Sequence, residues 1–484
     1  MSTPLKILFV SAEVYPLVKT GGLADISHAL PKALRQLGVD VRVLLPAYPP
    51  VLDRLTLTCE HDKVNLLHSL PPVRVLAGMM PDNSFPVYAL DCPQLYQRSG
   101  GLYQDQHGND WGDNALRFGA LSKLAALFGQ HYFTFQPDII HCNDWQTGLT
   151  ATYLAYSANP VHARVVQSLH NMAYQGIFDP AIMSVLELPA VSFNMYGLEY
   201  YGAVSFLKAG IYYSHWLSTV SPTYAKEIQT ATFGYGLAGL LRERNNQLQG
   251  ILNGIDVDDW NPRTDSYLPF HYSSEDFTGK AKNKQALCQR LGLMHPEKPL
   301  IAMITRLTYQ KGLDLVLPAI ADILNEGAQL ALLGSGDKSL EYQLQSLAKQ
   351  YQGRLSITIG YDETLAHQLE AGADIFLMPS RFEPCGLNQL YSMRYGTIPL
   401  VRRTGGLADT VTDTTPATLD KGNATGFVFD AEDHHAILHS VQRALLTYRD
   451  KATWRQLQLN GMLHDCSWQQ SAKAYMVLYQ HVLS

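Results

Sequence analysis

The sequence of 484 residues lacks any apolar run long enough to cross a membrane and contains no low-complexity segment. Its hydrophobic runs are of strand length, well short of the roughly 20 residues of a transmembrane helix. The opening MSTPL is followed at once by Lys6, which predicts no signal peptide. Charged residues make up only 17% and the net charge is -6, which argues against a protein that coats nucleic acid and against a polybasic membrane binder. An anionic ligand would therefore need a local cluster of cations.

The six cysteines, at positions 59, 92, 142, 288, 385 and 466, show neither CxxC spacing nor a Cys/His pattern typical of zinc. Scattered cysteines in so long a chain predict reduced thiols and a cytoplasmic location. The sequence also lacks GxSxG, HExxH, Walker A and protein-kinase motifs. These absences remove the common hydrolase, metalloprotease and P-loop chemistries.

What the sequence has is a regular alternation of apolar runs with stretches of helical periodicity. Runs such as KILFV, DVRVLLP and PDIIHCND come first, and PLIAMITR, AQLALLGSG and ADIFLMPS form a second series. Strands that alternate with helices predict parallel, doubly wound sheets. The stretch WGDNALRFGALSKLAALFG is predicted to be a long amphipathic helix. NGID and DDWNP interrupt the pattern at Gly250–Asp265, so we predict two doubly wound α/β domains, residues 1–255 and 256–460, and a terminal helix within 461–484.

One seven-residue pattern occurs twice, as KTGGLAD at Lys19–Asp25 and as RTGGLAD at Arg403–Asp409. Each copy follows a predicted strand and opens a helix, where free N–H groups and partial positive charge attract phosphate. Lys19, Gly21 and Gly22 are therefore candidate anion-binding residues, although a tight turn with a surface lysine would have the same pattern. Thr404, Gly405 and Gly406 are the corresponding candidates in the second domain.

Two further segments carry candidate chemistry. Arg306 and Lys311 lie on a loop after the strand PLIAMIT, where a guanidinium and an ammonium could hold a diphosphate. A solvated loop with two surface cations is the alternative. Glu383 lies in SRFEPCGLNQL, where a carboxylate could stabilise positive charge on an anomeric carbon or simply cap a helix. A cysteine at a helix start, such as Cys385, is more often chosen for its size than for its reactivity.

His170 and Asp144 also follow predicted strands, at the edge where parallel sheets bind ligands. Neither has a partner at metal-ligand spacing. A lone histidine is usually structural, but one that leaves a strand onto a loop at this edge is a candidate for the site. The 27 tyrosines and six tryptophans could provide stacking surfaces for sugars, although core packing accounts for most of them.

Several of these segments carry a family resemblance. The chain resembles bacterial members of the ADP-glucose-using glycogen and starch synthase family in SAEVYPLVKTGGLADI, HCNDWQTGL, SLHNMAYQGIF, GILNGIDVDDWNP, ITRLTYQKGLDL and PSRFEPCGLNQLYSMRYGTIPLVRRTGGLADTV. The resemblance implies a GT-B fold, with two Rossmann-like domains facing a deep cleft and a terminal helix that returns to the first domain. It implies transfer of glucose from ADP-glucose to the non-reducing end of an α-1,4-glucan, glycogen or maltooligosaccharide, with retention and with no metal or other cofactor.

The resemblance also implies roles for individual residues. Glu383, His170, Arg306 and Lys311 would be catalytic, with Glu383 supporting the transition state and the two cations neutralising the leaving diphosphate. Asp144 would help His170 to position sugar and acceptor. The implied donor-binding set comprises Lys19, Gly21, Gly22, Asp25, Asp144, Asn253, Tyr361 (near the adenine), Cys385, Gly386, Leu387, Thr404, Gly405 and Gly406. Asn388 is a minor departure, because some relatives have threonine there.

Other functions remain open at this stage. A related transferase that makes a disaccharide would share much of the pattern, and so would a non-catalytic glucan-binding protein. The sequence pattern alone does not rank ADP-glucose above UDP-glucose, and it leaves the oligomeric state open. Because no second carboxylate accompanies Glu383, we expect front-face attack by the acceptor hydroxyl rather than the two-carboxylate route of retaining hydrolases.

Overall fold

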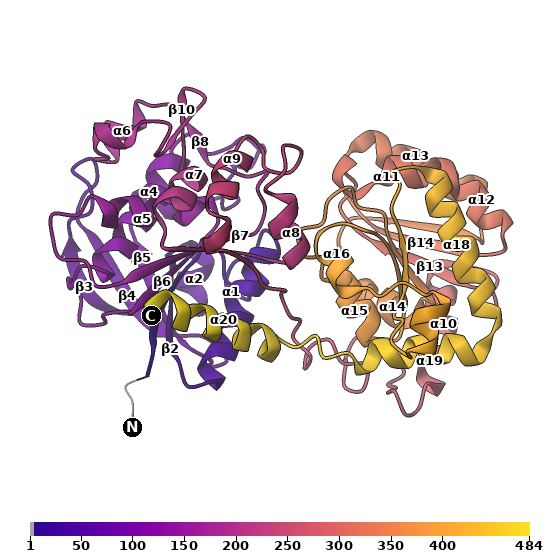
Figure 1. Ribbon diagram of the computed structural model, residues 1–484. Coiled ribbons are helices and arrows are strands. Elements are labelled where there is room, and N and C mark those ends of the chain that lie inside the picture. The colour runs from indigo at the N-terminus through magenta and orange to yellow at the C-terminus, as the bar shows by residue number, and fades with distance from the viewer. Residues whose placement is uncertain (1–3) are drawn as a thin grey trace. The chain divides into compact units, whose positions relative to one another are not determined.

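The computed structural model describes residues 4–484, which form two compact units (Figure 1). Unit 1 extends to Asn253 and also includes Trp468–Ser484, whereas unit 2 is Gly254–Ser467. The division thus falls slightly before the predicted boundary at residue 255. The predicted terminal segment 461–484 is shared, because its first residues end helix α19 (Lys451–Leu463) in unit 2. The stretch predicted not to be a signal peptide includes residues 1–3, which lie outside the described residues.

Unit 1 is built on a nine-stranded sheet with the order β12-β11-β7-β6-β1-β2-β5-β4-β3. The strands from β12 to β5 are parallel, and most of them are short, largely apolar and buried on both faces, as in parallel sheets that helices cover, whereas the edge strand β12 is only half-buried. β4 pairs antiparallel with β5 and β3, an edge that the sequence pattern did not predict. The bounds are β1 Lys6–Val10, β2 Asp40–Pro46, β3 Thr58–Val64, β4 Val73–Met79, β5 Pro86–Asp91, β6 Ile139–Asn143, β7 Arg164–Leu169, β11 Trp216–Thr219 and β12 Leu248–Gly250.

Helices cover this sheet, and a small antiparallel sheet, β8-β10-β9, lies in the segment after β7. The prediction that α4 (Asn114–Phe128), in the stretch WGDNALRFGALSKLAALFG, is amphipathic is wrong. Thirteen of its 15 residues are buried, so it is apolar nearly all round and lies inside the unit. The remaining bounds are α1 Gly22–Gln36, α2 Pro49–Arg54, α3 Pro93–Tyr96, α4 Asn114–Phe128, α5 Leu149–Ala155, α6 Ile182–Val185, α7 Phe206–Tyr213, α8 Pro222–Glu227, α9 Ala238–Glu243, β8 Ile177–Phe178, β9 Glu199–Tyr200 and β10 Ala203–Ser205.

Unit 2 is built on a six-stranded, fully parallel sheet with the order β15-β14-β13-β16-β17-β18. Apolar clusters on its two faces make a core of its own. The strands are β13 Leu300–Ile304, β14 Gln329–Gly334, β15 Leu355–Ile359, β16 Ile375–Met378, β17 Ile398–Arg402 and β18 Phe427–Phe429. The helices are α10 Thr278–Leu291, α11 Leu313–Val316, α12 Ile320–Asn325, α13 Lys338–Gln350, α14 Glu363–Gly372, α15 Asn388–Arg394, α16 Gly405–Thr410, α17 Pro416–Asp420, α18 His434–Arg449 and α19.

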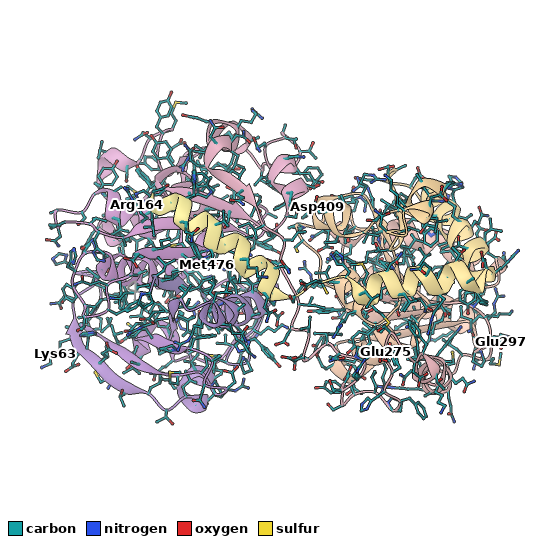
Figure 2. All side chains as sticks on the ribbon, turned by 60° about the horizontal axis from the view of Figure 1, so that its bottom comes forward. Lys63, Arg164, Glu275, Glu297, Asp409 and Met476 are labelled. Atoms are coloured by element: carbon teal, nitrogen blue, oxygen red, sulfur yellow. The ribbon has the colours of Figure 1, made fainter. Side chains whose placement is uncertain are left out.

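The terminal helix α20 (Trp468–Leu483) packs on unit 1 beside α1, as both views of the chain show (Figures 1 and 2). Its apolar face, which includes Tyr475 and Tyr479, belongs to the same core as β1. The Tyr479 hydroxyl contacts Nδ1 of His141 on β6 at 2.7 Å. Met476, labelled in Figure 2, packs at the rim of this core. In the described part of the chain, no helix combines the length and the apolarity needed to cross a bilayer.

Candidate active site

A cavity of about 180 Å³ opens at the carboxyl ends of β13 and β16 in unit 2. This is the edge at which an open parallel sheet binds its ligands. The loop after β13 provides Arg306 and Lys311, and the loop after β16 provides Glu383. The full lining comprises Met303, Ile304, Thr305, Arg306, Lys311, Leu377, Met378, Pro379, Ser380, Glu383, Gly386, Leu387 and Asn388. Three residues predicted to be catalytic are thus brought to one cavity.

Glu383 is the centre of the polar contacts in this cavity. Its Oε2 lies 2.5 Å from Lys311 Nζ and accepts a hydrogen bond of 2.9 Å from the Ser380 hydroxyl. The carboxylate is buried, and Lys311 is largely buried with it. Charge-assisted contacts of this kind hold both groups in one geometry. Glu383 therefore makes side-chain contacts across the cavity rather than the helix cap that was the alternative interpretation.

The start of α15 forms one wall of the cavity. Asn388 donates from Nδ2 to the carbonyl of Ile304 at 2.8 Å, which ties the start of α15 to the end of β13. Gly386 and Leu387 line the cavity directly before this helix, and Cys385 is buried behind them. Amide groups in the first turn of a helix have no intrahelical acceptor. This wall can therefore offer N–H donors to an anionic or hydroxyl-rich ligand.

The second copy of the seven-residue pattern packs beneath the Glu383 loop. The Gly406 amide donates to the carbonyls of Glu383 and Pro384, both at 3.1 Å. Gly405 has φ +43, and a Cβ there would lie 2.0 Å from the Glu383 carbonyl oxygen, so only glycine fits. Thr404 is buried with both glycines, while Asp409 is exposed on α16, where Figure 2 labels it. The predicted contact of Thr404, Gly405 and Gly406 with the donor stays a prediction.

The first copy, in unit 1, is open. A Cβ on Gly21 or Gly22 would meet nothing within 4 Å, which leaves room for a ligand at the start of α1. Lys19 Nζ pairs with Asp25 Oδ1 at 2.8 Å, and both side chains are partly exposed. The same seven-residue pattern is thus a packing element in unit 2 and an accessible helix start in unit 1.

Glu13, which the sequence pattern did not reveal, organises this turn. Its Oε2 accepts from the Thr20 and Gly21 amides at 2.6 and 3.0 Å, and its Oε1 accepts from the Tyr103 hydroxyl at 2.6 Å. Burial raises the pKa of Glu13 above its ordinary value, against the opposite effect of these hydrogen bonds. Because the Gly21 amide is bonded to Glu13, the donors left for an anion at this helix start are those further into the first turn of α1.

Asp144 and His170 meet at the carboxyl ends of β6 and β7. Asp144 Oδ1 accepts from the His170 amide at 2.7 Å, and burial raises the pKa of Asp144 to about 7. Asn143 donates to the Val10 carbonyl, so its Oδ1, 2.9 Å from His170 Nε2, must accept the histidine proton. Burial lowers the pKa of His170 to about 4. His170 is therefore neutral at pH 7, with Nδ1 as an unprotonated acceptor.

The remaining predicted residues occupy different settings. Tyr361 follows β15 and is 77% exposed, so its ring is available for stacking. Asn253, the last residue of the first segment of unit 1, is buried, and its Oδ1 has no hydrogen-bond partner in the described chain. A buried carbonyl oxygen of this kind is costly unless a partner binds it. Within residues 4–484, no cluster of three or more His, Cys, Asp or Glu side chains could hold a metal ion.

Comparison with known proteins finds two family models that match this chain. The model of the starch synthase catalytic domain covers residues 6–243, and the model of glycosyl transferases group 1 covers residues 292–456. A glycogen synthase of Nitrosospira multiformis is 48% identical over 99% of this chain and 98% of its own. One from Nitrosomonas europaea is 50% identical over 98% and 97%. The chain belongs to the glycogen and starch synthase family.

Solved structures agree with this family assignment. The catalytic domain of starch synthase IV from Arabidopsis thaliana, bound to ADP and acarbose, has a TM-score of 0.89, 33% sequence identity and coverage of 99% of this chain and 100% of that one. A sucrose-phosphate synthase from Thermosynechococcus elongatus, 18% identical over 99% and 98%, shares the fold with a TM-score of 0.60. As a member of the glycogen and starch synthase family, the chain is a retaining glycosyltransferase.

For this family member, sequence reasoning missed the residues that support the predicted ones. Ser380, just after β16, is hydrogen-bonded to Glu383. Asn143, the last residue of β6, is hydrogen-bonded to His170. The rule that polar residues at the carboxyl ends of parallel strands form the site would have found both. Glu13 carries a weaker signal, because it lies beyond the end of β1 among apolar residues.

Proposed function

We propose that this chain transfers glucose from ADP-glucose to the non-reducing end of an α-1,4-glucan, with retention at the anomeric carbon. The observation that carries the proposal is the contact of Lys311 with Glu383 in a cavity that Arg306 also lines. A sugar nucleotide has a diphosphate next to the reacting carbon, so its site needs cations and a carboxylate side by side. Glycogen synthase relatives and a starch synthase bound to ADP support ADP-glucose as the donor.

In the proposed reaction, charge develops at two places. Negative charge grows on the departing ADP, where Arg306, Lys311 and the first-turn amides of α15 would bind it. Positive charge grows on the anomeric carbon, where the Glu383 carboxylate would stabilise it. Preorganised groups of this kind are the largest contribution to many enzymatic rate accelerations. Because these protein groups can bind the leaving group, the proposal requires no metal and no other cofactor.

The number of carboxylates in the cavity favours attack by the acceptor on the face of the sugar from which ADP departs. Among the described residues that line the cavity, Glu383 is the single carboxylate. A double displacement would need a carboxylate nucleophile and an acid about 5 Å apart. We therefore assign front-face attack, in which the bond from the anomeric carbon to phosphate oxygen breaks and a bond to the acceptor O4 forms. The hydroxyl proton of the acceptor passes to the departing phosphate oxygen, and ADP leaves.

Residues of unit 1 are also assigned roles in the proposed reaction. Lys19 and the open start of α1 would contact donor phosphate. His170 Nδ1 would accept a hydrogen bond from a sugar hydroxyl, while Asp144 holds the His170 amide. Tyr361 of unit 2 would stack near the adenine, and the buried Asn253 Oδ1 would accept a hydrogen bond from substrate. Among the described residues, none of the six cysteines forms a disulfide, which supports a cytoplasmic setting for the reaction.

A donor-release assay tests the proposal. Purified protein with glycogen is given ADP-glucose or UDP-glucose, and nucleoside diphosphate release is compared with incorporation of glucose that an exo-acting α-1,4-glucan hydrolase can remove. We expect both signals with ADP-glucose and weaker ones with UDP-glucose. Transfer to free monosaccharides but not to maltooligosaccharides would indicate a disaccharide-forming transferase. Glycogen binding without any release of diphosphate would indicate a glucan-binding protein.

A further inference from the structure

Arg381 joins the two loops that carry Lys311 and Glu383. Its Nη1 and Nη2 donate to the two carboxylate oxygens of Asp314 at 2.7 and 2.8 Å. Asp314 lies in α11, directly after the turn that carries Lys311, whereas Arg381 lies two residues before Glu383. The ion pair therefore spans from the loop after β13 to the loop after β16.

Several further contacts reinforce this connection. The Arg381 guanidinium lies 3.6 Å above the ring centroid of Tyr309, and its Nη1 donates to the Tyr309 carbonyl at 2.8 Å. The Arg381 amide donates to the Gln310 carbonyl at 2.8 Å. Gln310 donates from Nε2 to the Phe382 carbonyl at 3.2 Å. A Cβ at Gly312 would lie 2.2 Å from the Pro379 carbonyl oxygen, so the two loops touch there as well.

A second ion pair holds Arg381 from the other side. Arg402 donates from Nη1 to the Arg381 carbonyl at 2.8 Å and from Nη2 to Glu432 at 2.6 Å. Glu432 also lies 3.5 Å from Nε of Arg381. The Arg381 side chain is only 11% exposed, and its hydrogen bond lowers the pKa of Asp314. A buried, bidentate guanidinium fixes orientation as well as distance, which lysine cannot do.

We propose that Arg381 is a positioning residue for the transfer reaction, because its pair with Asp314 keeps Lys311 Nζ and the Glu383 carboxylate in contact. Neither Arg381 nor Asp314 lines the cavity, so both act through the residues that do. The proposal rests on the proposed function, since it assigns the pair to the geometry of that same site. Without the pair, the Lys311 ammonium and the Glu383 carboxylate should both be present but misplaced.

The test is a double-mutant cycle on the full chain. Arg381→Lys and Asp314→Asn should each lower kcat with ADP-glucose and glycogen by about 10- to 100-fold, the effect of misplacing catalytic groups by about 1 Å. The KM for glycogen should stay within about two-fold, since neither residue contacts the acceptor in this scheme. The double variant should be no slower than the worse single variant, because both changes remove one interaction.

The matched control is Arg443 with Asp413, a pair of the same chemistry in unit 2 with Nη2 to carboxylate distances of 3.1 and 3.0 Å. Arg443→Lys and Asp413→Asn should leave kcat within two-fold of the parent. Thermal unfolding of the four single variants and of the double variant separates folding from positioning. If Arg381→Lys does not fold, Asp314→Asn decides alone, because that carboxylate is 41% exposed and the change is isosteric.

Three results would overturn the proposal: kcat of Asp314→Asn within two-fold of the parent, losses that multiply in the double variant, or equal losses in the control pair. A parent protein that releases no ADP from ADP-glucose would overturn the proposed function and this inference together. An active parent with unaffected Arg381 and Asp314 variants would overturn this inference alone.

Discussion

Replacing Glu383 by glutamine isolates the charge of the central carboxylate from its shape. The amide oxygen can still accept from Lys311 Nζ and from the Ser380 hydroxyl, now 2.5 and 2.9 Å from the carboxylate. The free energy of unfolding should therefore fall by only about 1.5–3 kcal/mol, the range for a hydrogen bond to a charged group. The transition state, however, loses the negative charge that faces the anomeric carbon. A single electrostatic stabiliser in an active site is worth about 2.7–4 kcal/mol, so kcat should fall about 10²- to 10³-fold.

The assay is ADP release from ADP-glucose with glycogen at saturation, together with the free energy of unfolding from urea titration. Glu383→Ala should be slower still and less stable, because it leaves Lys311 buried beside no carboxylate. Glu341 offers a matched control, since its Oε2 pairs with Lys338 Nζ at 2.8 Å in the same unit. Glu341→Gln should retain full turnover. A Glu383→Gln protein with kcat within a factor of three of the parent would refute the role assigned to this carboxylate.

Three further predictions concern unit 1. Lys19→Gln should raise the KM for ADP-glucose while glycogen binding, measured by sedimentation with the polymer, is unchanged; an unchanged donor KM would contradict the assignment. Glu13→Ala should expose the Thr20 and Gly21 amides, so hydrogen exchange across the turn before α1 should accelerate; unchanged protection there would show that other contacts hold the turn. Asp144 and His170, both half-buried, should impose opposite pH slopes on stability. The raised pKa of Asp144, about 7 when folded, makes stability fall as pH rises from 4 to 7, whereas the lowered pKa of His170, about 4, makes it rise between pH 4 and 6.5. Relative to the parent, melting temperatures of Asp144→Asn should therefore increase with pH across this window and those of His170→Gln should decrease, and parallel curves for all three proteins would contradict both shifts.

The architecture was predictable where burial dictates sequence. Strands such as β1 and β16 are continuous apolar runs because helices cover both faces of each sheet. The antiparallel edge at β3 was not predictable in the same way, since five of its seven residues are exposed and carry no apolar pattern. The periodicity of α4 led to a wrong prediction because the helix is buried nearly all round, and a helix inside a domain needs no polar face.

The candidate site was predictable only in part, and the doubled seven-residue pattern shows why. Both copies start a helix after a strand, as the residues alone indicate. What differs is the surrounding backbone: a Cβ at Gly21 meets nothing within 4 Å, whereas one at Gly405 would meet the Glu383 carbonyl oxygen at 2.0 Å. Contacts between segments distant in sequence, such as Glu13 with Tyr103, likewise leave no local pattern. The two copies have nearly the same local sequence, so the sequence predicted the same anion-binding role for both, although their tertiary surroundings differ.

The placement of α20 has a consequence for how the protein is made. Ribosomes release the chain from the N-terminus, and domains generally fold as they emerge. Here the core of unit 1 includes Tyr475 and Tyr479, which are translated after every residue of unit 2. The nascent first unit must wait with an uncovered apolar surface while the second, Gly254–Ser467, is already complete. Unit 1 therefore begins to be synthesised before unit 2 but obtains part of its core only after unit 2 has been made.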